Sequence, residues 1–228
     1  MRRAAALGAG LAALLAGSAQ AVAPRVQTMV VGPRAVLFDA HFVTAGATRV
    51  RVGGRSCRVR GGSGLATLAS ARRRGGPRFG VTGDCGAPYV RAVGRFAARG
   101  PDGWYYKVGQ RAPTIGSGAV LRSIRPGVRV LWFWCRFRAA SCQRTLAVQP
   151  AASRVKPGAS LTVTVTGYDD RGRGRRIAGA AVRLGAARAR TDAHGRAVLH
   201  APAHLGTAVL RAERAGLVPA FPERVTVG

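Results

Sequence analysis

Residues 102–146 constrain the fold most strongly, because two strand patterns lie there on either side of a Gly/Pro-punctuated connection. The first pattern follows an Asp-Gly tight turn and covers residues 104–108. The second follows a Pro-Gly turn and covers residues 128–137. Its centre, residues 131–134, is apolar on both faces, which is typical of a central strand. All three tryptophans fall in this segment, so we predict a β-structured domain with its core here.

The first 21 residues have the pattern of an export signal. Arg2 and Arg3 form a short basic region, an apolar run follows, and residues 19–21 supply a small-x-small cleavage site. We therefore expect the mature chain to begin near Val22 and to reach the cell envelope or the extracellular space. No later stretch approaches the roughly 20 apolar residues of a spanning helix, so we expect no transmembrane segment.

Four cysteines in an exported chain favour two disulfide bonds. Three pairings are possible, and we favour Cys57 with Cys85 and Cys135 with Cys142, because each pair brackets one local unit. A zinc site would need a different spacing, since no C-x-x-C pair is present. We therefore expect no metal site.

The formal net charge is +29, and 35 of the 37 basic residues are arginines, leaving only Lys107 and Lys156 as lysines. This skew resembles the codon bias of a GC-rich genome, so the composition leaves open whether the charge is functional. A field of this size should still attract anionic envelope polymers. The arginines are scattered singly, without a recognition helix, zinc finger or stacking sheet, so we expect no specific nucleic-acid partner.

The N-terminal part, residues 22–148, combines strand patterns with one helix pattern. Between residues 26 and 53 short apolar runs alternate with turns, and Arg49 and Arg51 alternate with valines as on a half-buried strand. The spacing predicts a helix over residues 63–74, with Ser63 as its cap and a Gly-Gly-Pro stop after it.

This part resembles the transcobalamin-like C-terminal domain family of bacterial exported proteins. The resemblance covers roughly residues 26–146 and rests on the order of several weak motifs, namely the helix sequence around residues 64–68, the strand DGWYYKVG and the strand PGVRVLW. It departs from the family at Gly109-Gln110 and at Val128, which are turn positions. It implies a β-grasp-like α+β fold, in which a mixed sheet holds one helix across its face. By resemblance only, a corrinoid cofactor is possible; otherwise we expect none.

Residues 151–228 change in character: aromatic residues become rare, and short alternating strands recur. Strand patterns fall at residues 161–166, 180–184, 197–200, 208–212 and 225–227, and residues 191–195 are expected to form a hairpin loop. This part resembles the Ig-like or carboxypeptidase-regulatory-like β-sandwich of cell-surface proteins, which implies a spacing or presenting role. The predicted fold class of the whole chain is therefore mainly β.

The candidate ligand-binding residues are Trp104, Tyr106, Trp132 and Trp134. They alternate along two strands, so some of them should point to each face of the sheet. The simpler interpretation is packing under the helix. The alternative is that an outward subset lines a shallow ligand face, where flanking arginines would suit a planar anion.

Other polar candidates indicate no chemistry. His194, His200 and His204 fall near one another, but His194 lies on a predicted turn and His204 on a predicted loop. Asp39 and His41 lack a nucleophile motif, and Asp169-Asp170 lies in a turn. We therefore predict a non-enzymatic, exported envelope protein that binds a small soluble ligand or a surface polymer through its N-terminal domain. The alternatives are a purely structural or adhesive module and a polyanion-binding protein, whose partner would be nucleic acid or a teichoic-type polymer.

Overall fold

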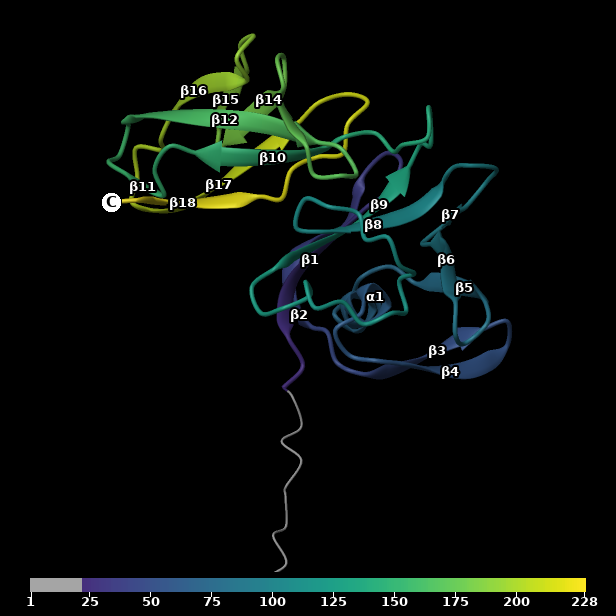
Figure 1. The fold of residues 1–228 in the computed structure, drawn as a ribbon. Helices are drawn as coiled ribbons and strands as arrows, with labels where there is room; N and C mark the ends of the chain where they lie inside the picture. Colours follow the sequence, from purple (N-terminus) through teal and green to yellow (C-terminus); the bar gives the residue numbers. More distant parts are fainter. Residues whose placement is uncertain (1–21) are drawn as a thin grey trace, which may run out of the picture.

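The computed structural model describes residues 22–228, so the predicted export signal at residues 1–21 lies outside the described part of the chain. Eighteen strands and one helix form the described fold, which confirms that the protein is mainly β. Figure 1 shows two parts, with helix α1 in the lower one and the strands from β10 onward in the upper one. Between residues 22 and 228 no helix is both long and apolar enough to cross a membrane.

The N-terminal part contains nine strands and the helix. Their bounds are β1 (Arg25–Val31), β2 (Val36–Thr44), β3 (Thr48–Val52), β4 (Arg55–Val59), α1 (Gly64–Arg73), β5 (Phe79–Gly83), β6 (Pro88–Val93), β7 (Phe96–Ala97), β8 (Gly103–Val108) and β9 (Arg129–Cys135).

The first sheet has the order β2-β1-β9-β8, and its two central strands, β1 and β9, run parallel. Helix α1 covers one face of this sheet, and Trp132 on β9 donates from its Nε1 to Oγ1 of Thr67 on the helix at 3.2 Å. A mixed sheet with one helix across its face is the arrangement that the family resemblance implies.

Helix α1 begins and ends close to the predicted positions. The Oγ of Ser63 accepts a hydrogen bond from the amide of Ala66 at 3.2 Å, which confirms Ser63 as the N-cap. Gly64 is required by a close approach, because a Cβ atom there would lie 2.6 Å from the ring of Tyr106. Ser63 therefore determines where the helix starts, and Gly64 allows it to approach the sheet closely.

A second sheet, with the order β4-β3-β5-β6-β7, packs against the other side of the helix core. The β-grasp-like prediction has a single sheet, whereas this part of the protein contains two sheets with the helix between them. Val50 and Val52 point inward while Arg49 and Arg51 stay exposed, as the alternation predicts. The disulfide Cys57–Cys85 ties β4 to the turn between β5 and β6.

The C-terminal part is a two-sheet sandwich. Its strands are β10 (Thr145–Pro150), β11 (Arg154–Val155), β12 (Ser160–Tyr168), β13 (Gly174–Arg176), β14 (Ala181–Leu184), β15 (Ala187–Arg190), β16 (Arg196–His200), β17 (Gly206–Glu213) and β18 (Glu223–Val227). Strand β12 pairs with β10 on one side and with β13 and β16 on the other, while the second sheet has the order β11-β18-β17-β14-β15. Apolar side chains of both sheets enclose one core.

The prediction of a hairpin loop at residues 191–195 was wrong in one respect. The segment does form a tight turn, in which Oδ1 of Asp192 accepts from the amides of His194 and Arg196 at 2.8 Å. Its flanking strands, however, belong to different sheets, because β15 pairs with β14 and β16 pairs with β12. A turn signal in the sequence marks the reversal but not the partner of the strand that follows.

A third apolar cluster joins the two parts and explains why β9 is apolar on both faces. Trp132 points toward α1, whereas Leu131 and Phe133 point to the opposite face of the sheet. There they pack with Val218 and Phe221 from the segment between β17 and β18. The sandwich therefore covers the face of the first sheet that the helix leaves free.

Candidate functional site

Three of the four aromatic residues predicted to bind a ligand lie in the core. Trp104, Tyr106 and Trp132 expose 3%, 8% and 1% of their surface. Tyr106 and Trp132 stack at 4.9 Å between ring centroids, and Trp104 meets Trp134 edge-on at 5.8 Å. The packing interpretation therefore describes these three side chains. A corrinoid or any other ligand could reach them only if the core opened.

Burial also defines the chemistry of Tyr106. Loss of solvent raises the pKa of its phenol to about 12, because the charged form is disfavoured away from water. The hydroxyl donates a long hydrogen bond of 3.4 Å to the carbonyl of Ile115. The phenol is therefore a neutral core group at physiological pH.

Trp134 differs, because it is half-buried and lines a cleft between the two parts of the protein. The cleft has a volume of about 1230 Å³. One wall is the turn between β1 and β2, at residues 31–36, and the other is formed by residues 181–183 and 188–190 and by the segment from Arg211 to Ala220. Residues from both ends of the chain thus meet at one concave surface.

Seven arginines line this cleft, against one acidic residue, Glu213. The arginines come from both walls and are Arg34, Arg136, Arg183, Arg188, Arg190, Arg211 and Arg214. The floor includes apolar side chains, among them Met29, Val31 and Trp134. The cleft therefore presents positively charged side chains around an apolar floor.

Three of these arginines form a row across adjacent strands. In the antiparallel registers Arg188 on β15 lies opposite Arg183 on β14, and Arg183 lies opposite Arg211 on β17. Directly opposed residues of antiparallel strands point to the same face, so the three side chains project together. Like charges in such positions destabilise a sheet, so this row carries a cost to folding. We refer to these three residues as the arginine row.

Only one member of the arginine row has an acidic partner among residues 22–228. The guanidinium of Arg211 holds both carboxylate oxygens of Asp39 on β2, at 2.5 and 3.3 Å. This bidentate contact keeps the pKa of Asp39 below its usual value. Within the described chain Arg183 and Arg188 make no side-chain hydrogen bond or ion pair.

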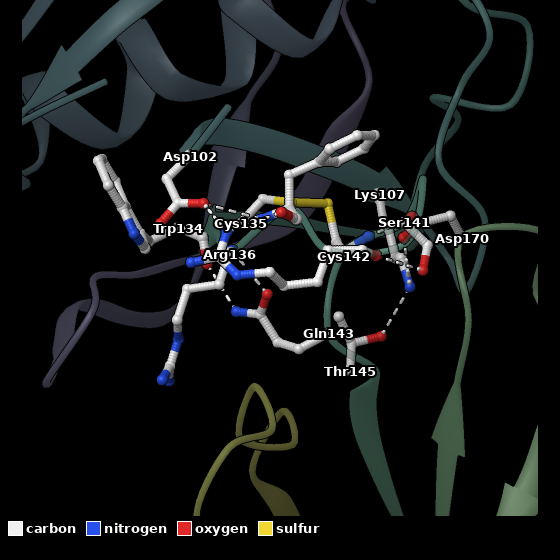
Figure 2. The surroundings of a disulfide bond; sticks show 12 residues. Asp102, Lys107, Trp134, Cys135, Arg136, Ser141, Cys142, Gln143, Thr145 and Asp170 are labelled. Atoms are coloured by element: carbon white, nitrogen blue, oxygen red, sulfur yellow. Dashed lines mark hydrogen bonds and ion pairs between the residues drawn. A yellow bond between two sulfur atoms is a disulfide. The ribbon is translucent and has the colours of Figure 1, made fainter. Parts of the chain in front are cut away.

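A buried lysine outside the cleft lining joins the two parts of the protein. Lys107 on β8 has no exposed side-chain surface, and Figure 2 shows its Nζ atom directed at Thr145 and Asp170. Nζ also donates to the carbonyls of Tyr168 and Asp169, at 3.1 and 2.9 Å. One side chain of the N-terminal part therefore holds the turn between β12 and β13 of the sandwich.

The second disulfide lies beside this lysine. Cys135 at the end of β9 is bonded to Cys142, and the amide of Cys142 donates to Oδ2 of Asp170 at 2.9 Å (Figure 2). Both disulfide pairings predicted from sequence are thus confirmed. Burial lowers the pKa of Lys107, and the nearby carboxylate of Asp170 opposes that shift.

The remaining polar candidates are placed in structural roles. Asp169 accepts from the amides of Arg171 and Arg173, as expected for a turn residue. Asp39 pairs with Arg211 rather than acting with His41. Across the described residues no group of three or more His, Cys, Asp or Glu side chains is arranged to hold a metal ion.

The sequence signal for the arginine row exists but is weak. Arg183, Arg188 and Arg190 alternate with small or apolar residues on either side of the Gly185-Ala186 turn, which is a hairpin pattern. Similar alternation occurs at Arg49 and Arg51, which do not line the cleft. Which of 35 arginines face a concave surface depends on how the two parts dock.

Comparisons with known proteins assign the chain to no family. No protein-family model and no curated protein matches the chain. Among solved structures, the D00-D0 domain of Intimin is similar at 16% sequence identity and a TM-score of 0.29, over 43% of this chain. The match spans about half of that chain, 55% of its length. The resemblance of the N-terminal part to transcobalamin-like domains stays a prediction.

Proposed function

We propose that this is an exported envelope protein that binds an anionic ligand in the cleft between its two parts. The observation that carries the proposal is the arginine row: three guanidinium groups project together into a concave surface, and only Arg211 has an acidic partner within residues 22–228. A costly cluster of like charge is stabilised when an oxyanion binds to it.

The chemistry of the lining favours binding over catalysis. Arginine stays protonated throughout the physiological pH range and offers a planar fork of N–H donors, which matches carboxylate and phosphate oxygens. An arginine can orient a bound anion, but it is a poor general acid or general base, because it does not readily lose its proton. We accordingly propose a binding module that acts without a cofactor, in place of an enzyme.

Two disulfide bonds support the exported location, because such bonds persist in oxidising compartments. We propose two domains, but with the boundary near residue 144 in place of the predicted 148, because β10 (Thr145–Pro150) pairs with β12 and its Leu146 and Val148 lie in the sandwich core. Each contains its own apolar core, and a smaller cluster joins them. The cleft lies at this junction, a common position for binding sites.

A purely structural or adhesive module is the second candidate. It is favoured by the filled first sheet, whose two faces are covered by α1 and by the sandwich. If the protein is such a module, the joined domains serve as a stiff spacer and the arginine row has no ligand. The two candidates differ in whether a defined anion binds at the cleft.

The test is a titration with tripolyphosphate, followed by the fluorescence of Trp134. We compare Arg183→Ala/Arg188→Ala with the control Arg49→Ala/Arg58→Ala, an exposed pair that is also directly opposed on antiparallel strands. Both double variants remove the same charge. We expect the cleft variant to bind about tenfold more weakly and the control to bind like the wild type. Equal weakening in the two variants would mean that only net charge matters.

A further inference from the structure

The dimensions of the arginine row specify the kind of anion. Resting on the proposed function, we propose that the cleft takes a linear polymer with repeated oxyanion groups, such that successive groups bind successive arginines. Adjacent strands lie about 4.8 Å apart, so the three arginines of the row extend over roughly 10 Å. A single phosphate or carboxylate fills only a small part of that length.

The contact between Asp39 and Arg211 shows how the row holds an oxyanion. The carboxylate lies at one end of the row and is bound by the fork of one guanidinium. Arg183 and Arg188 continue the row with the same side chain at the next two strand positions. A ligand with regularly spaced oxyanions would repeat the Asp39 contact at each of them.

Further arginines extend the charged surface beyond the row. Arg34 and Arg136 lie on the N-terminal side of the cleft, and Arg190 and Arg214 lie on the sandwich side. All four are exposed. Positive charge is thus distributed along both walls of a cleft of about 1230 Å³, larger than the roughly 300–1,000 Å³ typical of small-molecule pockets. A polymer of several units can contact arginines along both walls, whereas a compact anion can contact only a few of them.

The lining argues against a nucleic acid as the polymer. Proteins that bind single strands combine basic residues with several aromatic side chains on which successive bases stack. Among residues 22–228, Trp134 is the one aromatic residue of the cleft lining, and Trp104 and Trp132 are buried in the core. The surface suits a polymer of alternating oxyanions and small linkers, without flat rings.

The experiment measures affinity against chain length by calorimetry. The probes are orthophosphate, tripolyphosphate, long-chain polyphosphate and polyglutamate, with oligothymidylate as the nucleic-acid arm. We expect affinity to rise about tenfold or more from orthophosphate to tripolyphosphate, as further arginine contacts form. Polyphosphate and polyglutamate distinguish phosphate from carboxylate as the preferred oxyanion, and tight binding of either supports a linear polyanion.

Two variants connect the chain-length effect to the arginine row. For Arg183→Ala/Arg188→Ala, we expect the slope of log affinity for polyphosphate against log salt concentration to become shallower by about one unit for each lost contact. Asp39→Asn frees Arg211, so binding should strengthen about threefold. Arg49→Ala/Arg58→Ala serves as the charge-matched control, and thermal unfolding of every variant verifies that it is folded.

The outcomes separate this inference from the proposed function. If orthophosphate binds as tightly as the polymers, and the cleft variant weakens it, the linear-polymer inference is overturned while the anion site stands. If no anion binds, or the control variant loses as much affinity as the cleft variant, both are overturned. Tighter binding of oligothymidylate than of polyphosphate overturns the linear-polymer inference in favour of a nucleic acid.

Discussion

The Nζ atom of Lys107 lies 3.4 Å from Oδ1 of Asp170, across the junction between the two parts of the protein. The lysine side chain is fully buried, whereas that of Asp170 keeps 26% of its surface exposed. Because Nζ also has two carbonyl acceptors and the hydroxyl of Thr145, the cost of burying its charge is offset by four polar partners. This arrangement joins β8 of the N-terminal part to the turn between β12 and β13 of the sandwich.

Replacing this lysine should destabilise the protein. Lys107→Met removes the charge but retains an unbranched apolar chain, and it removes the donor shared by the carbonyls of Tyr168 and Asp169 and by Oδ1 of Asp170. We expect the free energy of unfolding to fall by about 3 kcal/mol. Urea denaturation provides the measurement.

Lys156→Met is the matched control, because Lys156 is the protein's other lysine and is exposed. It should change stability by less than about 0.5 kcal/mol. A double-mutant cycle with Asp170→Asn then isolates the coupling between lysine and carboxylate. No loss in Lys107→Met would show that the buried lysine contributes nothing to joining the domains.

The two disulfides should differ in their contribution to stability. Cys57–Cys85 closes a loop with a sequence separation of 28, and Cys135–Cys142 one of 7. On the chain-entropy relation, removing the first costs about 3.6 kcal/mol and removing the second about 2.4 kcal/mol. Paired Cys→Ala variants, compared by chemical unfolding, test this. The reverse order would indicate that Cys135–Cys142 stabilises mainly through the domain junction.

The alkaline pH dependence should depend on Tyr106, whose pKa is raised by burial from 10.0 to about 12. Between these values the unfolded chain has lost the phenol proton and the folded chain keeps it, so stability falls as pH rises through this window. Tyr106→Phe should remove about 2 kcal/mol of that fall. Unfolding measured from pH 10 to pH 12 tests this, with Tyr105→Phe, on the exposed face of the same strand, as control. An unchanged slope in Tyr106→Phe would contradict the assignment.

The two tryptophans of β9 should respond differently to the same substitution. Trp132→Phe loses a buried hydrogen bond to Thr67 and leaves a gap under the helix, so we expect a loss of about 2 kcal/mol. Trp134→Phe, at a half-buried position in the cleft, should cost less than about 1 kcal/mol but abolish the fluorescence response to tripolyphosphate. If the response persists in Trp134→Phe, the ligand contacts another part of the protein.

Much of the fold could be predicted from local patterns. The cap at Ser63, the alternation around Val50 and the turn before β9 each follow from chemistry within a few residues. The two disulfide pairings were accessible for the same reason, since each cysteine pair brackets a local unit. These features do not depend on how distant segments pack.

The cleft could not be predicted in this way, because it depends on docking. The apolar residues of β9 indicated a central strand, but not that Leu131 and Phe133 pack against a second domain. Burial of Trp132, by contrast, comes from packing under helix α1 within the N-terminal part, which the alternation along the strand allowed. The arginine row depends on the pairing of β15, β14 and β17 and on the docking that brings Asp39, from a distant strand, beside Arg211.

Amide hydrogen exchange with and without tripolyphosphate tests the central claim, that the anion binds in the cleft, most directly. Bound ligand should slow exchange in the turn between β1 and β2, in β14 and β15, and in the segment from Arg211 to Ala220, which form the cleft walls. The arginine-bearing hairpin of β3 and β4 should be unchanged. Protection spread over both regions, or confined to the β3–β4 hairpin, would contradict an anion site between the domains.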